Sequence, residues 1–580
     1  MKRALLLIVL VVNVVGISAQ TNITVSNPIS LNIMLGNYNP SLYSQSTAIS
    51  HPDSISVGIY QSISPDSLKA NIIKLGSFGN RNSGSDTISP SFGIGAARTW
   101  VLGKFQHYSN ANENRLIPFY LQFDLLICTV DKHKDICAVL PGTDTSDKSI
   151  IIIEGHIDSR CEGLCDSLCN AQGIEDNAGG TALVMELARV MSQYSYKHTI
   201  VFLVTIAEEQ GLYGAEAFAD YTTQEGILVK AVQNNDVVAD IVCGHTSSPP
   251  SCSGFGAVDS VDVRLFSAGG FNSKHKGYAR FTKLEYKEQL LPMVATPMNI
   301  LIMTPEDRTG RSGDHVPFRA KGYASIRYTS ANENGDADVS DTNYVDHQHS
   351  TRDTLGVDTD GDQLIDSFFV DFNYLARNAY INGNAAAMCA VGPKQPDFNL
   401  TSPGPNKIRV EVTLETGYNM YRVGVRTNTN DWDTVFTMTN TLIDTFDVSS
   451  PGTNVFVSIM SVDDDSVESI PSRELLVNII GIEEPSLNEN YGVELFQNRP
   501  NPFDEVTYIQ LFAQPDFQYK KTEIIVTSVN GVQLRVIPIE INTGLNEIMY
   551  NHGYGATGLL FYSLVIDGRV VDTKSMVFAN

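Results

Sequence analysis

The sequence lacks the two features that most directly indicate a nucleic-acid-binding or a membrane protein. It has no excess of basic residues, because 40 lysines and arginines stand against 65 aspartates and glutamates, a formal net charge of −25. Such a charge repels phosphate backbones, so we expect no nucleic-acid partner. Beyond the N-terminus, no apolar run approaches the roughly 18 residues that indicate a membrane-spanning helix. We therefore expect no transmembrane segment in the mature chain.

The chain also lacks the composition of a disordered protein. Hydrophobic residues make up 42% of it and charged residues 18%, so most of its length can form ordinary cores. At about 150 residues per domain, 580 residues correspond to about four domains.

The one long apolar run lies at the N-terminus. Two basic residues precede apolar residues 4–15, and the small pair Ser18-Ala19 follows. This pattern is typical of a cleaved signal peptide over residues 1–19, since the run is short for a membrane span of ~20 residues. A membrane anchor is the alternative. The sequence thus predicts a secreted protein.

Cysteines are few but even in number, and the eight in an exported chain favour disulfides. Cys128 and Cys137 flank a polar segment between two apolar runs, which predicts a disulfide across a hairpin. Cys243 and Cys252 are spaced to close a similar small loop.

Three further cysteines form the run Cys161, Cys165 and Cys169. They could bind a metal, but their spacing is not the paired CxxC of zinc ribbons, and oxidation competes outside the cell. We therefore expect disulfides here, with the pairing left open.

The pattern from about residue 57 to 392 predicts an α/β domain. Residues 150–153 and 199–206 are apolar runs of the length of buried strands, and residues 179–192 carry apolar side chains at helical spacing between them. The alternation predicts a mixed, mainly parallel sheet flanked by helices, within a catalytic domain of residues 20–393.

Helical periodicity is lacking after this region. Residues 396–482 contain short alternating runs separated by polar turns, which predicts a β-sandwich. A linker at 483–488 leads to a second all-β segment, residues 487–580, with the hairpin turns Asn530-Gly531 and Asp567-Gly568.

Residues suited to metal chemistry gather in five segments of the α/β region. In α/β folds, ligands bind at the carboxyl ends of the strands. Two adjacent glutamates or a lone buried aspartate at such a place cost free energy unless cations neutralise their charge. Asp176 taken alone would be an ordinary helix cap. Imidazole and carboxylate together suit zinc, and a shared carboxylate allows two ions ~3.5–4 Å apart. The residues are His156, Asp158, Asp176, Glu208, Glu209, Asp240, His347 and His349.

These segments resemble the zinc-dependent exopeptidase family that includes bacterial leucyl aminopeptidases, with glutamate carboxypeptidases and glutaminyl cyclases as relatives. The resemblance covers about residues 60–390. The matching segments are residues 155–159 (family pattern GHxDS), 173–180 (GADDDASG), 207–214 (AEExGLxGS), 240–242 (LDM), 314–318 (SDHxPF) and 349–354 (HTxxDT), with 79–83 and 93–100 upstream.

The resemblance implies the zinc exopeptidase fold and a site with two zinc ions. Asp176 would bridge them, Glu208 would be the general base, and Asp158 would hold the imidazole of His156. The implied metal ligands are His156, Asp176, Glu209, Asp240 and His349.

This sequence departs from the family pattern in two places. Glu175 and Asn177 stand where the family has aspartates on either side of the bridging residue. The segment around Asp240 lacks the usual following methionine, so Asp236 is an alternative ligand, as His347 is for His349.

The implied activity is removal of N-terminal residues from peptides by a secreted aminopeptidase. Water activated at zinc would give a proton to Glu208, which would pass it to the leaving amine. Three alternatives stay open: a glutaminyl-peptide cyclotransferase, which needs one zinc; a zinc carboxypeptidase; and a non-catalytic surface-binding protein that works through its β-domains.

A further acidic segment has the oxygen spacing of a calcium loop and resembles thrombospondin type 3 repeats. It lacks the glycine and the terminal glutamate of an EF-hand, so a solvated acidic loop is the alternative. Its carboxylates are Asp358, Asp360, Asp362 and Asp366.

The two all-β segments resemble known modules. Residues 396–482 are similar, weakly, to a fibronectin type III domain. Residues 487–580 resemble the C-terminal sorting domain of the type IX (Por) secretion system, through the run 494–504 and the later turns. This resemblance implies export through the periplasm and across the outer membrane by that machinery, with release or attachment at the cell surface.

Overall fold

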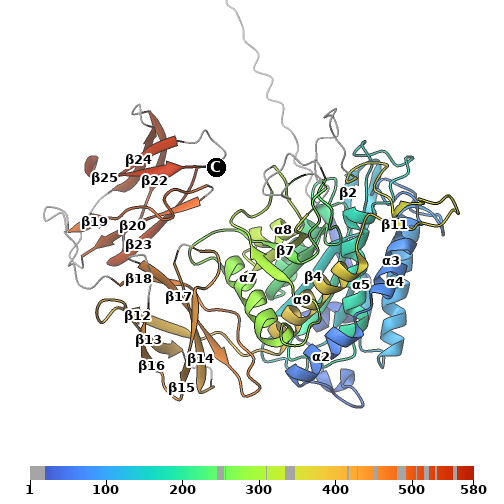
Figure 1. Cartoon of the computed structure of the whole chain (residues 1–580), viewed down its shortest axis with the longest axis horizontal. Coiled ribbons are helices and arrows are strands. Elements are labelled where there is room, and N and C mark those ends of the chain that lie inside the picture. The colour runs from blue at the N-terminus through green and yellow to red at the C-terminus, as the bar shows by residue number, and fades with distance from the viewer. Residues whose placement is uncertain are drawn as a thin grey trace, which may run out of the picture.

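The structure is a computed structural model (Figure 1). It describes residues 20–244, 254, 256–308, 310–332, 347–414, 417–427, 429–448, 454–479, 492–504, 506–514, 521–528, 532–552 and 558–579. The predicted signal peptide and the predicted linker lie outside these residues. Among the helices of the described ranges, none combines the length and the apolar character that a membrane span requires.

A nine-stranded mixed sheet forms the centre of the first part of the chain, in the order β1-β2-β3-β5-β4-β6-β9-β7-β8. Its middle strands β5, β4, β6 and β9 run parallel, and antiparallel pairs join β1, β2, β3 and β5 on one side and β9 to β7 on the other. The strands are β1 (Thr21–Val25), β2 (Ile117–Ile127), β3 (Val130–Leu140), β4 (Ile150–His156), β5 (Thr199–Thr205), β6 (Val229–Asn235), β7 (Asp262–Phe266), β8 (Asn299–Ile302) and β9 (Ser325–Ser330).

Helices flank this sheet, as predicted. Both α5 and α9 pack on β4 and on each other, while α6 and α8 contact each other and the strands β3 and β6 respectively. The helices are α1 (Pro28–Met34), α2 (Pro52–Ser62), α3 (Pro65–Gly76), α4 (Gly93–Ala111), α5 (Gly179–Met191), α6 (Tyr213–Glu225), α7 (Lys274–Glu285), α8 (His315–Ala320) and α9 (Phe372–Val391), with short turns η1 (Pro40–Tyr43), η2 (Ile174–Ala178) and η3 (Tyr286–Leu290).

The buried elements predicted around the site are confirmed by β4, β5 and α5. Both strands are buried at every position, because helices cover them and other strands border them on both sides. Nearly all of α5 is buried as well, with Arg189 as its one residue that is not, so its apolar positions pack on all sides.

The strands after α9 are antiparallel and form two further cores, around Val423 and around Ile509, while β10 and β11 pair in a separate two-stranded sheet. Asp567-Gly568 makes the predicted hairpin turn between β24 and β25, whereas Asn530-Gly531 lies outside the described residues. The strands are β10 (Gly356–Val357) and β11 (Ser367–Phe368), then β12 (Asp397–Thr401), β13 (Lys407–Leu414), β14 (Met420–Arg426), β15 (Thr434–Thr439), β16 (Ile443–Asp447), β17 (Asn454–Val462) and β18 (Leu475–Asn478), then β19 (Val493–Leu495), β20 (Val506–Ala513), β21 (Thr522–Ser528), β22 (Gln533–Pro538), β23 (Gly544–Asn551), β24 (Gly558–Ile566) and β25 (Arg569–Phe578).

A buried ion cluster joins the β-sandwich of β12–β18 to the α/β domain. Glu474 of the sandwich accepts hydrogen bonds from Arg426 at 2.6 Å and from Arg280 of α7 at 3.2 Å. The backbone N–H of Asn272 donates to the same carboxylate at 3.0 Å. The two arginines hold the pKa of Glu474 below its ordinary value even though burial opposes its charge. The sandwich is therefore docked on the α/β domain.

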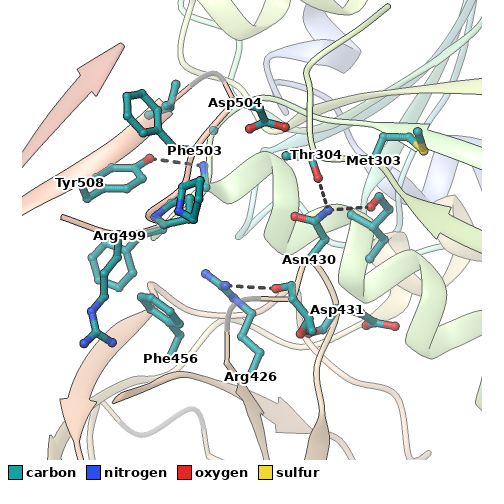
Figure 2. A pocket seen from close by; sticks show the side chains of 18 of the residues that line it. Met303, Thr304, Arg426, Asn430, Asp431, Phe456, Arg499, Phe503, Asp504 and Tyr508 are labelled. Carbon is teal, nitrogen blue, oxygen red and sulfur yellow. Dashed lines mark hydrogen bonds between the residues drawn. The ribbon is translucent and has the colours of Figure 1, made fainter. Parts of the chain in front are cut away.

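A cavity of about 830 Å³ lies where the three parts of the chain meet (Figure 2). Asn430 of the sandwich donates to Thr304 at 2.9 Å on one side, and the hydroxyl of Tyr508 accepts from the N–H of Gly270 at 3.3 Å on another. None of the histidines or carboxylates predicted to bind zinc lines this cavity.

The predicted disulfide between Cys128 and Cys137 is wrong. The turn between β2 and β3 falls at Cys128 and Thr129, and Cys137 lies well along β3 opposite Phe119, where it is a free, buried thiol. Cys128 bonds to Cys165 instead, with Cα atoms 5.2 Å apart. Cys243 is disulfide-bonded. Its predicted partner, Cys252, lies outside the described residues.

Candidate metal centre

The sheet brings the predicted side chains to one edge. His156 is the last residue of β4, Glu208 and Glu209 follow β5 closely, and Asp236 follows β6 directly. These strands are parallel neighbours, so their carboxyl ends meet at the same edge. Asp176, in the turn η2 that leads into α5, reaches the same place.

One half of the cluster surrounds the Nε2 atom of His156. This atom lies 3.2 Å from Oδ1 of Asp176 and 3.4 Å from Oδ1 of Asp236. His156 is fully buried, and the two aspartate side chains are only 5% exposed. The three ligand atoms lie within 4.8 Å of one another, so a single cation could contact all of them.

The other half surrounds the Nε2 atom of His349. It lies 3.1 Å from Oδ2 of Asp176 and 3.0 Å from Oε2 of Glu209. The second oxygen of Glu209, Oε1, is buried and makes no hydrogen bond to any residue that the structure describes. An acceptor left in this state is costly unless a cation or a proton compensates it.

Asp176 thus faces one histidine–carboxylate pair with Oδ1 and the other with Oδ2. Nitrogen and carboxylate donors in two groups of three, sharing one carboxylate, are a donor set that fits two zinc ions.

The structure places Asp236, and not Asp240, beside His156. Strand β6 ends at Asn235, and Asp240 lies in the loop that residues 237–241 form. In this loop the carboxylate of Asp240 accepts a hydrogen bond from the N–H of Val242 at 2.9 Å. It belongs to neither group of ligand atoms, and Asp236 takes the place beside His156.

The structure places His349 in the cluster and His347 outside it. The ring of His347 packs on Phe369, with ring centroids 4.2 Å apart, and the ring of His349 enters the cluster.

Asp158 supports the cluster in two ways. The Nδ1 atom of His156 lies 3.1 Å from its carbonyl oxygen and 3.5 Å from its carboxylate. The carboxylate also accepts the backbone N–H groups of Glu208 and Glu209, both at 3.2 Å. The sequence suggested the contact of Asp158 with His156 but not its contacts with the two backbone N–H groups. Through these, Asp158 also fixes the segment that carries Glu208 and Glu209.

The electrostatics of the cluster follow from burial and mutual charge. Burial raises the pKa of Glu208 well above its ordinary value; the positive charge of His156 lowers it, and the charges of Asp236 and other carboxylates raise it further. Burial alone would lower the pKa of His156, but the surrounding carboxylates, Glu208 foremost, raise it well above its ordinary value. Burial likewise opposes the charge of Asp176, yet its contacts with the two histidines hold its pKa well below the ordinary range.

Two buried residues outside the predicted set position Asp176. Asp353 accepts the backbone N–H groups of Glu175 at 2.8 Å and Asp176 at 3.1 Å. Arg81 donates to the carbonyl oxygens of Ile157 at 2.8 Å and Gly173 at 2.9 Å, at the two ends of the loop between His156 and Asp176. Asp353 lies in segment 349–354 and Arg81 in segment 79–83, both of which match the family pattern. The sequence thus pointed to these segments but did not indicate what the two side chains do.

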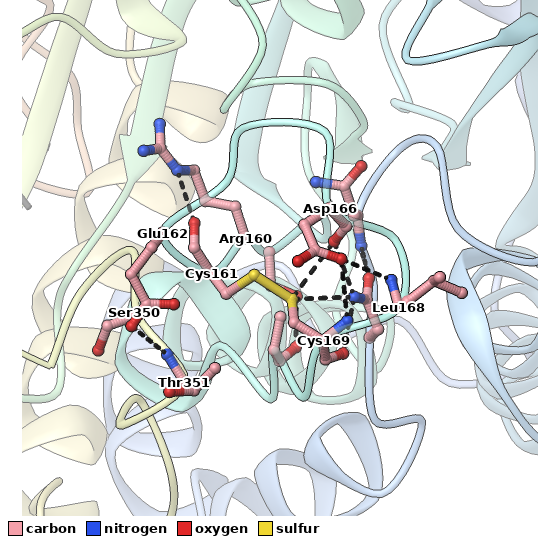
Figure 3. The surroundings of a disulfide bond; sticks show 12 residues. Arg160, Cys161, Glu162, Asp166, Leu168, Cys169, Ser350 and Thr351 are labelled. Atoms are coloured by element: carbon pink, nitrogen blue, oxygen red, sulfur yellow. Dashed lines mark hydrogen bonds between the residues drawn. A yellow bond between two sulfur atoms is a disulfide. The ribbon is translucent and has the colours of Figure 1, made fainter.

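Two disulfides stabilise the same loop, and Figure 3 shows one of them, the bond between Cys161 and Cys169. Cys161 bonds to Cys169 within it, and Cys128 ties it to the β2–β3 turn through Cys165. The expectation of disulfides over a metal cluster is thus confirmed. Beside the first bond, Glu162 accepts the N–H of Thr351 at 3.4 Å, which links the loop to the segment that carries His349.

The acidic segment predicted to bind calcium forms a loop between β10 and β11. Ligand oxygens of Asp358, Asp360 and Asp366 lie within 4.8 Å of one another, while Asp362 is not part of this group. All three side chains are exposed. They accept hydrogen bonds from backbone groups of the same loop, for example from the N–H of Gly361 to Asp358 at 2.6 Å.

Known proteins are similar in sequence and fold to the part of the chain that carries this site. The model of a family described as peptidase family M28 matches residues 135–369. A protein of Leptosphaeria maculans described as a probable zinc metalloprotease is 32% identical over 338 residues, which cover 56% of this chain and 73% of that protein. Among solved structures, the chain is similar to the LapA aminopeptidase of Legionella pneumophila (16% identity, TM-score 0.42, covering 61% of this chain and 78% of that one). It is also similar to the glutaminyl cyclase of Porphyromonas gingivalis (13% identity, TM-score 0.37, covering 56% and 98%).

Proposed function

Because the chain belongs to peptidase family M28 and is a zinc metallopeptidase, we propose that it is an aminopeptidase with two zinc ions. The observation that carries this proposal is the position of Asp176, which offers one oxygen to each of two histidine–carboxylate pairs. His156, Asp176 and Asp236 would hold one ion, and Asp176, Glu209 and His349 the other. Zinc, when bound there, supplies a Lewis acid that polarises the peptide carbonyl and makes water more acidic.

Glu208 is the proposed general base. Its backbone is fixed by Asp158, and its carboxylate lies close enough to His156 and Asp236 for their charges to shift its pKa. A buried glutamate with a raised pKa is a better proton acceptor than an exposed one. Glu208 would take a proton from the attacking water and give it to the leaving amine.

The charge around the cluster supports action at the N-terminus of the substrate. Five carboxylates, those of Asp158, Asp176, Glu208, Glu209 and Asp236, surround two histidines. This excess of negative charge favours zinc and a positively charged α-amine, and it disfavours the C-terminal carboxylate that a carboxypeptidase must bind.

The test compares purified wild-type protein with Asp236→Asn and its matched control Asp240→Asn. Zinc per chain is measured together with hydrolysis of amino-acid p-nitroanilides and cyclisation of a peptide with N-terminal glutamine. We expect two zinc ions and p-nitroanilide hydrolysis in the wild type and in the control, and loss of zinc and activity in Asp236→Asn. A single zinc with cyclisation of the glutamine peptide would favour a glutaminyl cyclase, and loss of zinc only in Asp240→Asn would contradict the ligand set.

Replacement of Glu208 by Gln separates catalysis from metal binding. We expect both zinc ions to remain and turnover to fall by about 10²–10⁴, the typical contribution of a general base. Near-normal hydrolysis by this variant would exclude the role proposed for Glu208.

For the C-terminal domain of β19–β25 we propose a role in export by the type IX secretion system. Support comes from the resemblance of residues 487–580 to its sorting domains and from the signal-peptide pattern of residues 1–19. Deletion of residues 487–580 in a host with this system should leave the enzyme in the periplasm. Unchanged extracellular activity would rule the proposal out.

We further propose that the loop with Asp358, Asp360 and Asp366 binds calcium, and that the sandwich is a fibronectin type III-like module. Calcium titration of the whole protein, with Asp360→Asn as the variant, tests the first proposal. We expect saturable calcium binding that Asp360→Asn weakens. Equal heats of calcium binding in the wild type and in Asp360→Asn would reject the proposed calcium site.

A further inference from the structure

A buried arginine contacts one of the two halves of the metal centre. Arg327 lies on β9, where it is in register with Asn234 of β6, two residues before Asp236. Its Nη2 atom lies 2.9 Å from Oδ2 of Asp236, and both side chains are almost completely buried, at 1% and 5% exposure. Oδ2 is the oxygen that does not face His156, since Oδ1 is the one 3.4 Å from the imidazole.

The arginine is itself held in place. Its Nη1 atom donates to Oδ2 of Asp307 at 2.7 Å and to the carbonyl oxygen of Ser312 at 3.2 Å. Oδ1 of Asp307 accepts the N–H of Arg308 at 2.7 Å and its Nε–H at 3.2 Å. The guanidinium is thus fixed on both sides, with one carboxylate behind it and the carboxylate of Asp236 in front.

The backbone of Asp236 is also fixed by β9. Its N–H donates to the carbonyl oxygen of Tyr328 at 3.3 Å, and its own carbonyl oxygen accepts the hydroxyl of Thr329 at 3.0 Å. Main chain and side chain of Asp236 are therefore held by three consecutive residues of one strand.

Among the residues that the structure describes, the side chains of the other half have no such support. Oε1 of Glu209 and Nδ1 of His349 are the atoms of these two side chains that face away from the cluster contacts given above, and both are buried and make no hydrogen bond to the described part of the chain. In the first half, the corresponding atoms are held by Arg327 on Asp236 and by Asp158 on His156.

We infer that Arg327, fixed by Asp307, is a positioning residue that restricts Asp236 to one oxygen as a metal ligand and makes the two halves bind zinc unequally. This inference rests on the proposed two-zinc centre. A charge-assisted hydrogen bond occupies Oδ2 and leaves Oδ1 aimed at the ion. Partners of metal ligands typically change metal affinity by about 10–100-fold when they are removed.

The experiment measures zinc affinity in protein with only one half complete. Zinc is titrated in competition with a fluorescent chelator into His349→Ala, which leaves the His156 half, and into His156→Ala, which leaves the His349 half. Arg327→Met is then added to each. We expect affinity to fall about 10–100-fold in the first background and to change less than about threefold in the second.

Two further variants keep the test decisive. Asp307→Asn preserves the shape around Arg327 and should lower the affinity of the His156 half by a smaller factor, so it replaces Arg327→Met if that protein does not fold. Arg264→Met removes a buried arginine of β7, 3% exposed, that donates to the carbonyl oxygen of Ser330. This control should leave both affinities unchanged.

The outcomes separate the two proposals. Equal losses of zinc affinity in both backgrounds would overturn the role of Arg327. So would an unchanged zinc affinity of the His156 half in both Arg327→Met and Asp307→Asn. Failure of the wild type to bind two zinc ions would instead overturn the proposed centre.

Discussion

Replacement of Glu474 by Gln tests whether the sandwich is a docked part of the enzyme or a loosely attached module. The substitution keeps the shape of the side chain but removes the negative charge between Arg280 and Arg426. Glu474 is 3% exposed and accepts hydrogen bonds from both guanidinium groups, two of them at 2.6 Å. Loss of one member of a buried ion cluster leaves the others uncompensated and typically costs about 3–5 kcal/mol. We expect a loss of this size in the free energy of unfolding.

The assay uses the two tryptophans of the chain, Trp100 in α4 and Trp432 in the sandwich. In a Trp100→Phe background, urea unfolding followed by fluorescence reports the sandwich alone. The matched control is Asp397→Asn, which breaks a 2.8 Å pair with Arg473 whose side chains are 44% and 50% exposed.

Because that control pair is solvated, its loss should cost less than about 1 kcal/mol. If Glu474→Gln also costs less than about 1 kcal/mol at the Trp432 transition, the buried cluster does not hold the sandwich on the catalytic domain.

The other predictions concern the site, its metal and the pH dependence of stability. Gly180→Ala should abolish zinc binding, because a Cβ atom there would lie 2.1 Å from the carbonyl oxygen of Asn235 and would force Asp176 away from β6. The control is Gly277→Ala, whose Cβ atom would meet no other atom within 4 Å. The measurement is the zinc content per chain of both variants. Two zinc ions in Gly180→Ala would contradict the prediction. Treatment with a chelator should remove activity and added zinc should restore it, whereas activity that survives complete removal would exclude a zinc mechanism. Burial, followed by the charge of Glu288, raises the pKa of Glu468 from 4.5 to about 7, so the folded protein keeps a proton there that the unfolded chain has released. Glu468 should therefore lower the free energy of unfolding as the pH rises from 4.5 to 7, and Glu468→Gln should make the decline over this range shallower. Equal slopes of the free energy of unfolding against pH in urea unfolding of the two proteins would refute this.

The site could be predicted largely from sequence because its residues follow apolar strands or begin a helix. His156 and Glu209 are examples, since the runs before them are so apolar that the strand ends are plain.

The structure places Asp236 and not Asp240 beside His156, and the sequence did not indicate this for a physical reason. Strand β6 ends in Gln233, Asn234 and Asn235, three polar residues that are fully buried, so the sequence does not look like a buried strand there. Their side-chain NH2 groups donate to partners far away in the sequence, such as the carboxylate of Glu154 for Asn234. The apolar residues after Asp236 resembled a strand and form a loop.

The supporting residues could not be predicted because their partners are distant in sequence. Arg327 contacts a residue 91 positions earlier only because β9 lies beside β6 in the sheet. The pairing of Cys128 with Cys165 likewise depends on how the loop after β4 returns to the β2–β3 turn.

The central claim is that five side chains hold two zinc ions through one shared aspartate. Anomalous scattering measured at the zinc edge on crystals of the whole protein tests it most directly. We predict two peaks, one among His156, Asp176 and Asp236 and the other among Asp176, Glu209 and His349. A single peak, or a peak beside Asp240 with none beside Asp236, would contradict the account.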